Sequence, residues 1–162
     1  MTDSSTSISS LDLAAVYVDF TIDQLDADDR AQLKKLMLDH VACVLCGAAQ
    51  PVGRNLVAWA AENGAPGRAV LFGSGRTAGA AAAALINGTS AHGYELDDTH
   101  DASMSHPGAV VISTALALGS ERGASGADVM AAITVGYEAM ARAGMAANAL
   151  NVLNAGFHPT AL

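Results

Sequence analysis

Apolar residues recur at intervals of three and four along most of this chain, a spacing typical of helices with one buried face. The clearest repeat runs from Leu33 to Leu45. It predicts a helix that Asp26 or Asp28 caps and that Gly47 ends, because glycine adopts a positive φ at little cost. The same spacing predicts further helices over residues 11–20, 51–63, 77–86, 109–121 and 129–150.

Turn and capping residues separate these predicted helices. Thr77 is a candidate N-cap for the helix over residues 77–86, and Asn87-Gly88 is expected to end it. Only residues 69–72 have the character of a strand. The pattern therefore predicts a mainly all-α, helical bundle-like domain with at most one short strand.

The longest predicted helix carries signals for close packing. Ser125 and Asp128 resemble a capping box at its start. Gly136 and Gly144 lie on or near one of its faces, although a glycine inside a helix costs about 1 kcal/mol relative to alanine. We therefore expect both glycines to permit close contact between helices.

Composition and charge narrow the class of protein. The 162 residues, 51% of them hydrophobic, suffice for one packed domain, predicted over residues 11–162. The Ser/Thr-rich residues 1–10 are expected to be disordered and lack the regions of a signal peptide. Eight scattered basic residues against sixteen acidic ones give a net charge of −8, and no apolar run has membrane-spanning length. We expect a cytoplasmic protein that binds neither nucleic acid nor membrane.

Two short motifs have both a structural and a functional interpretation. Cys43 and Cys46 form a CxxC that follows His40, a spacing that a metal or redox site could use. Buried free cysteines commonly pack as small apolar residues, so we favour packing. Residues 72–79, FGSGRTAG, have the glycine spacing GxGxxxG and not the GxGxxG of nucleotide-binding loops, so we favour a structural turn.

One polar segment interrupts this apolar chain. Residues 87–108, NGTSAHGYELDDTHDASMSHPG, hold three histidines, three aspartates and a glutamate between two predicted helices. Four interpretations remain open: a solvated loop, a site for zinc, manganese or iron, a buried polar network, and a general acid and base. His106-Pro107 and His158-Pro159 each hold a histidine on stiff backbone, which favours a functional interpretation.

Several segments resemble the MmgE/PrpD family, in that family's order. The polar segment is similar to the family's signature at Asn87-Gly88, Ala91-His92, Glu95-Leu96-Asp97-Asp98-Thr99-His100 and His106-Pro107. Other similarities lie in the helix from Leu38-Asp39 to Gly47, in SG…GYE at residues 125–138 and in GFHPT at residues 156–160. The resemblance covers nearly the whole chain from about residue 11.

The resemblance implies a fold and a class of reaction. Family members have a helical domain that carries most of the active site, a smaller α+β lid domain, and usually a homodimeric assembly. They are dehydratases, a decarboxylase and an epimerase that act on small polycarboxylates such as 2-methylcitrate, without a metal or other cofactor. All need proton transfer at a carbon next to a carboxylate.

The resemblance also implies site residues. His106 would be the proton-transfer residue, with Glu95 or Asp97 as its catalytic partner. The implied substrate contacts are Thr99, His158 and Asp98. Where many members have Asp-x-Asp-Asp, this chain has Glu95 in the first position, which moves that carboxylate one methylene further out.

The chain ends directly after GFHPT, whereas family members run to well over twice this length, so we expect the lid and its basic residues to be absent. A polycarboxylate needs cations or donors to offset its lost hydration, and the polar segment has no Lys or Arg. We therefore expect at most weak activity from this chain alone, with a homodimer partner or a complementing C-terminal polypeptide supplying the rest. The alternatives are a noncatalytic fragment that associates through apolar helix faces and a small metal-binding helical module.

Overall fold

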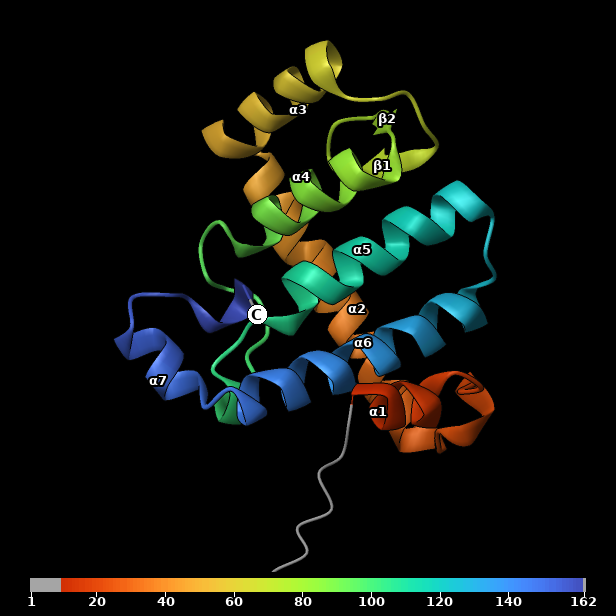
Figure 1. Ribbon diagram of the computed structural model, residues 1–162. Coiled ribbons are helices and arrows are strands. Elements are labelled where there is room, and N and C mark those ends of the chain that lie inside the picture. Colours follow the sequence, from red (N-terminus) through yellow and green to blue (C-terminus); the bar gives the residue numbers. More distant parts are fainter. Residues whose placement is uncertain (1–9, 162) are drawn as a thin grey trace, which may run out of the picture.

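The computed structural model of the protein describes residues 10–161. Disorder was expected for residues 1–10, and all of these except Ser10 lie outside the described range. Within that range seven α-helices follow one another (Figure 1): α1 (Ser10–Tyr17), α2 (Ala27–Ala48), α3 (Pro51–Asn63), α4 (Ala80–His92), α5 (Pro107–Arg122), α6 (Gly126–Ala146) and α7 (Ala149–Asn154). There are also two strands, β1 (Ala69–Leu71) and β2 (Arg76–Ala78), and three 3₁₀ turns, η1 (Ile22–Gln24), η2 (Asp101–Ser103) and η3 (Pro159–Ala161). The predicted mainly α fold is confirmed.

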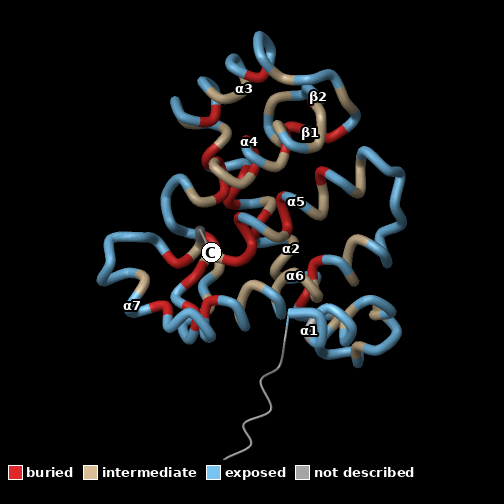
Figure 2. The backbone as a smooth tube through the Cα atoms, in the orientation of Figure 1, coloured by how far each residue is buried: buried red, intermediate tan, exposed pale blue. Residues whose placement is uncertain are grey.

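The centre of the fold is formed by α2, α4 and α5. Helix α4 packs against both α2 and α5, and α5 also packs against α6. Figure 2 shows the buried positions gathered on these central helices, with α1 and α3 largely exposed around them. Val44 on α2 and Ile112 on α5 are completely buried. The described C-terminal end returns to the start of α5, which brings two distant histidine segments together (Figure 1).

Helix α2 begins where the sequence predicts but does not end there. The Asp26 carboxylate accepts hydrogen bonds from the backbone N–H groups of Asp28 and Asp29, which confirms the predicted cap. The prediction that Gly47 ends the helix at a positive φ is wrong, because α2 continues to Ala48. A Cβ at position 47 would lie 1.9 Å from the carbonyl oxygen of Ser90, so this glycine lets α4 cross α2 closely.

The glycine-rich segment forms a hairpin turn. Gly73 and Gly75 have φ values of 76° and 69°, which confirms the structural interpretation of FGSGRTAG. The turn pairs β1 with β2, so the chain has two short strands where at most one was expected. Thr77 lies opposite Val70 in this pair and is not a helix cap, because α4 begins after Gly79.

The predicted break at Asn87-Gly88 is also wrong, since α4 continues through both residues to His92. The buried Asn87 side chain accepts a hydrogen bond from the Phe72 N–H (3.2 Å) and donates one to the Val70 carbonyl (2.9 Å). A Cβ at Gly88 would lie 2.6 Å from the Ala109 carbonyl oxygen, which makes this glycine a contact point for α5. The turn signals at these two residues therefore serve tertiary contacts, and His92 belongs to a helix.

The last helices follow the prediction in part. The capping box of Ser125 and Asp128 is present at the start of α6. Gly136 is in close contact with α5, as predicted, because its Cβ would meet Val111, whereas the Cβ of Gly144 would meet Ser103 in the 3₁₀ turn η2. The helix predicted over residues 129–150 ends earlier, at Ala146, and α7 follows a left-handed residue, Asn148, with φ 53°.

The CxxC residues differ in environment. Both Cys43 and Cys46 are free thiols, but Cys43 is buried in the core beside Ala91 and Ala109 whereas Cys46 is exposed. The packing interpretation therefore holds for Cys43 alone. In the described part of the chain no single helix is long and apolar enough to cross a membrane, and α2 with α3 would reach that length only as a pair bent by 85°.

Candidate active site

The polar segment folds over the end of α4 and the start of α5, and its central feature is the buried carboxylate of Asp97. Its side chain is 1% exposed, and its Oδ1 atom lies 3.2 Å from Nδ1 of His92 and 3.4 Å from Nδ1 of His106. The His92 contact is a hydrogen bond, whereas the His106 nitrogen lies at ion-pair distance without hydrogen-bond alignment. Two imidazoles thus face one carboxylate oxygen.

Helix ends hold the two imidazoles in place. His92 is the last residue of α4, and His106 is the N-cap residue of α5, directly before Pro107 in the first turn. Proline fixes φ and needs no hydrogen-bond partner there, so the sequence His-Pro fits a helix start. The two rings lie 4.6 Å apart, edge to face.

A third imidazole joins them from the end of the chain. The ring of His158 lies 5.8 Å from that of His92 and 6.1 Å from that of His106. The His106 N–H donates to Thr160 Oγ1 at 3.0 Å, which ties the two His-Pro segments together. The Thr160 N–H donates to Nδ1 of His158, so the proton of a neutral His158 ring lies on Nε2.

The loop between Asp98 and His106 stabilises itself with its own polar side chains. His100 pairs with Ser105 in an isolated β-bridge, and its Nδ1 lies 2.8 Å from Ser103 Oγ. Ser103 and Ser105 are buried and their hydroxyls lie 2.7 Å apart. His100 therefore acts within the loop, and Met104 closes it with a left-handed φ of 49°.

Asp98 lies beside Asp97 in the sequence but is held by different partners. Its Oδ2 accepts from the Tyr137 hydroxyl at 2.8 Å and its Oδ1 from the Gly108 N–H at 2.9 Å. Burial raises the pKa of Asp98, and the two hydrogen bonds oppose that shift. Burial and the neighbouring Asp98 raise the pKa of Tyr137, so its hydroxyl stays protonated as a donor. Both Asp98 oxygens thus bind protein donors, and its predicted substrate contact stays a prediction.

Two other predicted site residues face solvent. Glu95 is exposed, with a positive φ of 51°, and Thr99 is exposed in the loop that follows. Neither side chain forms a hydrogen bond or ion pair with the residues that the structure describes. Of the residues predicted for the site, the structure brings together Asp97, His106 and His158. The roles assigned to Glu95 and Thr99 stay predictions.

His92 received no role in the sequence prediction. It lies in the segment that resembles the family signature, but neither the resemblance nor its spacing assigned it a contact with Asp97. A usable signal is its position in the same short segment as Asp97 and His106. The ligand atoms of these three residues lie within 4.8 Å of one another and could hold a divalent cation, so the metal interpretation stays open on geometry.

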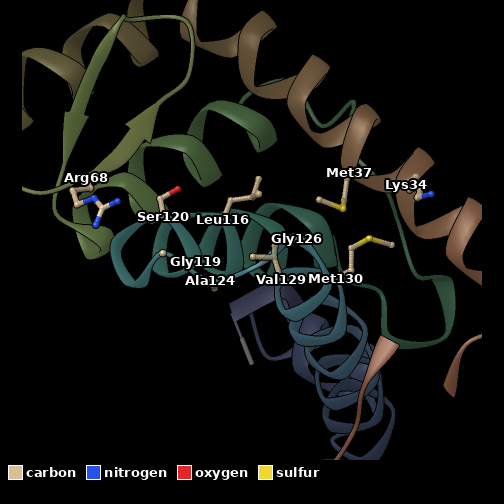
Figure 3. Close-up of a pocket in the computed structure, with 11 residues that line it drawn as sticks. Lys34, Met37, Arg68, Leu116, Gly119, Ser120, Ala124, Gly126, Val129 and Met130 are labelled. Carbon is tan, nitrogen blue, oxygen red and sulfur yellow. The ribbon is translucent and has the colours of Figure 1, made fainter. Parts of the chain in front are cut away.

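Two hollows of the surface differ in their relation to these residues. The larger, about 610 Å³, lies between α2, α5 and α6, with Met37, Leu116 and Met130 lining it and Lys34 and Arg68 at its sides (Figure 3). It contains none of the predicted site residues. The smaller, about 460 Å³, lies between α4 and α5 and reaches His92 and Thr160. We place the site beside the smaller hollow, because His92, which lines it, is the residue that also contacts Asp97 and His106.

Comparisons with known proteins agree with the resemblance. Residues 11–162 match the family described as the MmgE/PrpD N-terminal domain. A cis-aconitate decarboxylase of Aspergillus terreus is 33% identical over 141 residues, which cover 84% of this chain and 29% of the relative. A cis-aconitate decarboxylase-like protein, oryM, of Aspergillus oryzae is 30% identical over 141 residues, 83% of this chain and 29% of the relative. The chain thus spans less than a third of the length of these relatives, and no solved structure gives a significant match.

Proposed function

Because the chain belongs to the MmgE/PrpD family, we propose that it is the N-terminal portion of a cofactor-independent lyase acting on a small polycarboxylate. The observation that carries this proposal is the buried Asp97 carboxylate with two imidazoles, those of His92 and His106, at its Oδ1 atom. A buried carboxylate orients an imidazole and stabilises its protonated form, which suits a group that gives and takes protons.

The chemistry follows from the free ring nitrogens. With Nδ1 turned toward Asp97, the Nε2 atom of His106 is left for the substrate. In a dehydration, a base removes the proton from the carbon next to a carboxylate, and an acid protonates the departing hydroxyl. In a decarboxylation, the carbon–carbon bond breaks, carbon dioxide leaves, and the acid protonates the carbon that keeps the electron pair. We assign the proton transfer at carbon to His106, which both reactions require.

Charge supports a binding role for the histidines. No lysine or arginine among the described residues lines the smaller hollow, so we propose that the imidazoles of His92, His106 and His158 donate to a substrate carboxylate. A substrate with two or three carboxylates needs more donors than these. We therefore propose that a second copy of the chain or a complementing polypeptide supplies the remaining cations.

The substrate is proposed from the names of the relatives. Two matched proteins are a cis-aconitate decarboxylase and a cis-aconitate decarboxylase-like protein, so cis-aconitate is the first compound to test. The family resemblance adds 2-methylcitrate and iminodisuccinate. All three carry the feature that the proposed chemistry needs, a carbon next to a carboxylate where a proton is removed or added.

The test combines binding with turnover. The chain, labelled with ¹⁵N, is titrated in heavy water with each of the three compounds while the ring signals of His92, His106 and His158 are followed by NMR. We expect these signals to shift with one of the compounds and deuterium to enter that compound or its product slowly. If millimolar concentrations of all three move none of the ring signals and no deuterium is incorporated, the proposed function is wrong.

A second candidate function is association without catalysis. It is favoured by apolar side chains on α7 and just after it, where Leu150 is 54% exposed, Leu153 42% and Phe157 68%. Such neighbouring exposed residues often mark an interaction surface. Light scattering after gel filtration distinguishes the candidates: a stable oligomer that the triple variant Leu150→Ser, Leu153→Ser, Phe157→Ser abolishes, together with no response of the histidines to polycarboxylates, would favour association alone.

A further inference from the structure

A fourth histidine lies buried in the core behind the candidate site. His40 is on α2 and is 2% exposed, and its Nε2 atom lies 3.1 Å from the Ser113 hydroxyl on α5. It lies outside both surface hollows described above. A buried histidine is costly unless both of its nitrogens find partners, so the second nitrogen requires an explanation.

Several buried polar atoms near the candidate site have no hydrogen-bond partner among the described residues. They include Nδ1 of His40, Oδ2 of Asp97 and the hydroxyl of Ser90. Leaving such a group unpaired costs stability, and native proteins usually satisfy it directly or through ordered water. One of these atoms is a ring nitrogen that can donate, and another is a carboxylate oxygen that can only accept.

Electrostatics shows that His40 and Asp97 act on each other. Burial lowers the pKa of His40 to about 4, and the charge of Asp97 opposes that shift. The thiol of Cys43, the next buried residue on the same helix, has a raised pKa because of burial and nearby carboxylates, Asp97 among them. The buried face of α2 therefore lies within electrostatic range of Asp97, and His40 is neutral at neutral pH.

The tautomer of this neutral ring depends on the direction of the hydrogen bond with Ser113. A neutral imidazole has one donor nitrogen and one acceptor nitrogen. If the Ser113 hydroxyl donates to Nε2, the proton lies on Nδ1, where the negative charge of Asp97 favours it. Oδ1 of Asp97 faces His92 and His106, so Oδ2 is the oxygen that lacks a donor.

We propose that His40 is a positioning residue for Asp97: its Nδ1–H donates to Asp97 Oδ2 through one ordered water, while Ser113 holds the opposite ring nitrogen. Anchored at Oδ2, the carboxylate keeps Oδ1 turned toward the two imidazoles of the site. This inference rests on the proposed function only in taking Asp97 as part of a proton-transfer site. The contact itself can be tested without a substrate.

The test uses two substitutions, each of which can replace the hydrogen bond of only one of the two ring nitrogens. The side-chain amide of His40→Asn reaches about as far as Nδ1, and that of His40→Gln about as far as Nε2. Long-range ¹H–¹⁵N NMR of the labelled chain reports the His40 tautomer and the ring signals of His92 and His106. We expect the His40 ring to carry its proton on Nδ1 from pH 8 down to about 5. In His40→Gln we expect the His92 and His106 ring signals to be displaced, and in His40→Asn we expect them to stay close to wild type.

Two controls complete the experiment. Cys43→Ala removes volume from the same buried face of α2 without removing a donor to Asp97, and we expect the ring signals to stay near wild type. Ser90→Ala tests the competing donor. The proposal is overturned if the His40 proton lies on Nε2, if the Asn and Gln variants displace the signals equally, or if Ser90→Ala alone reproduces the displacement. Should both His40 variants fail to fold by circular dichroism, the wild-type tautomer still decides.

Discussion

Nδ1 of His106 lies 3.4 Å from Oδ1 of Asp97, inside a loop whose carboxylate is almost completely buried. The two residues come from different supports, since Asp97 follows the end of α4 and His106 caps α5. Their geometry therefore depends on the packing of α4 against α5, and not on the loop alone. Side chains held by rigid elements in this way can keep a defined proton-transfer geometry.

The first prediction concerns this pair. Asp97→Asn keeps the size of the side chain but removes the charge that orients and stabilises the imidazoles. General acid–base catalysis contributes about 10²–10⁴-fold to a rate, so we expect deuterium incorporation into the responsive polycarboxylate to fall by about that factor, to the level of buffer. Asp101→Asn is the matched control, because it neutralises an exposed carboxylate in the same segment. Equal rates in wild type and Asp97→Asn would contradict the assigned role.

The second prediction concerns the hydrogen bond between Tyr137 and Asp98. This bond joins α6 to the loop just before α5, and the carboxylate accepts it at 2.8 Å in a partly buried environment. Tyr137→Phe leaves the ring in place but removes the donor, so we expect the free energy of unfolding to fall by about 1.5–3 kcal/mol. Urea denaturation followed by circular dichroism measures it.

Tyr17→Phe serves as the comparison for that loss. Its hydroxyl donates to Glu138 and accepts from Arg142, both on the same helix α6, but at an exposed position. Exposed hydrogen bonds compete with water, so this variant should lose less than about 1 kcal/mol. Similar losses in the two variants would show that burial of Asp98 adds nothing to the strength of its bond.

The sequence predicts the helices well and their junctions poorly. Periodicity and caps located the starts of α2 and α6, because these signals act within a few residues. Gly47 and Asn87-Gly88 were misassigned as helix ends, because their roles are contacts with Ser90, with the hairpin and with α5. Nothing local distinguishes a glycine that ends a helix from one that admits a neighbouring helix.

The residues of the candidate site were likewise predicted only in part. The resemblance located Asp97, His106 and His158, which the fold brings together from distant parts of the chain. It could not indicate that His92 would share the Asp97 carboxylate, since that depends on α4 continuing past Gly88. The sequence places His40 on the apolar face of α2 and next to the CxxC, but its contact with Ser113 depends on how α2 packs against α5 and has no local signal.

The third prediction is a pH dependence of stability. The pKa of His40 is about 4 in the folded protein, lowered mainly by burial, against 6.5 for an unperturbed histidine. Between these values the unfolded chain binds more protons than the folded one, so the free energy of unfolding falls as the pH drops from 6.5 to 4. The loss is at most about 3 kcal/mol. In His40→Leu this contribution vanishes, and urea denaturation at several pH values should give a correspondingly flatter profile than wild type. Parallel profiles would contradict it.

The last prediction concerns the crossing of α2 and α4. A Cβ at Gly47 would lie 1.9 Å from the Ser90 carbonyl oxygen and 2.7 Å from its carbon, and these backbone atoms cannot move aside as a flexible side chain would. Gly47→Ala should therefore force the helices apart and lower the free energy of unfolding by about 3 kcal/mol or more. Because Ser90 lies two residues before His92, we also expect the His92 ring signal to shift.

Gly126→Ala provides the matched control for that substitution. Gly126 opens α6, and nothing lies within 4 Å of the Cβ that alanine would add. Alanine there should leave stability unchanged or raise it by about 0.4–1 kcal/mol, because it restricts the unfolded chain. Thermal denaturation of both variants separates the two effects. If Gly47→Ala were as stable as Gly126→Ala, α2 and α4 would not cross as closely as described.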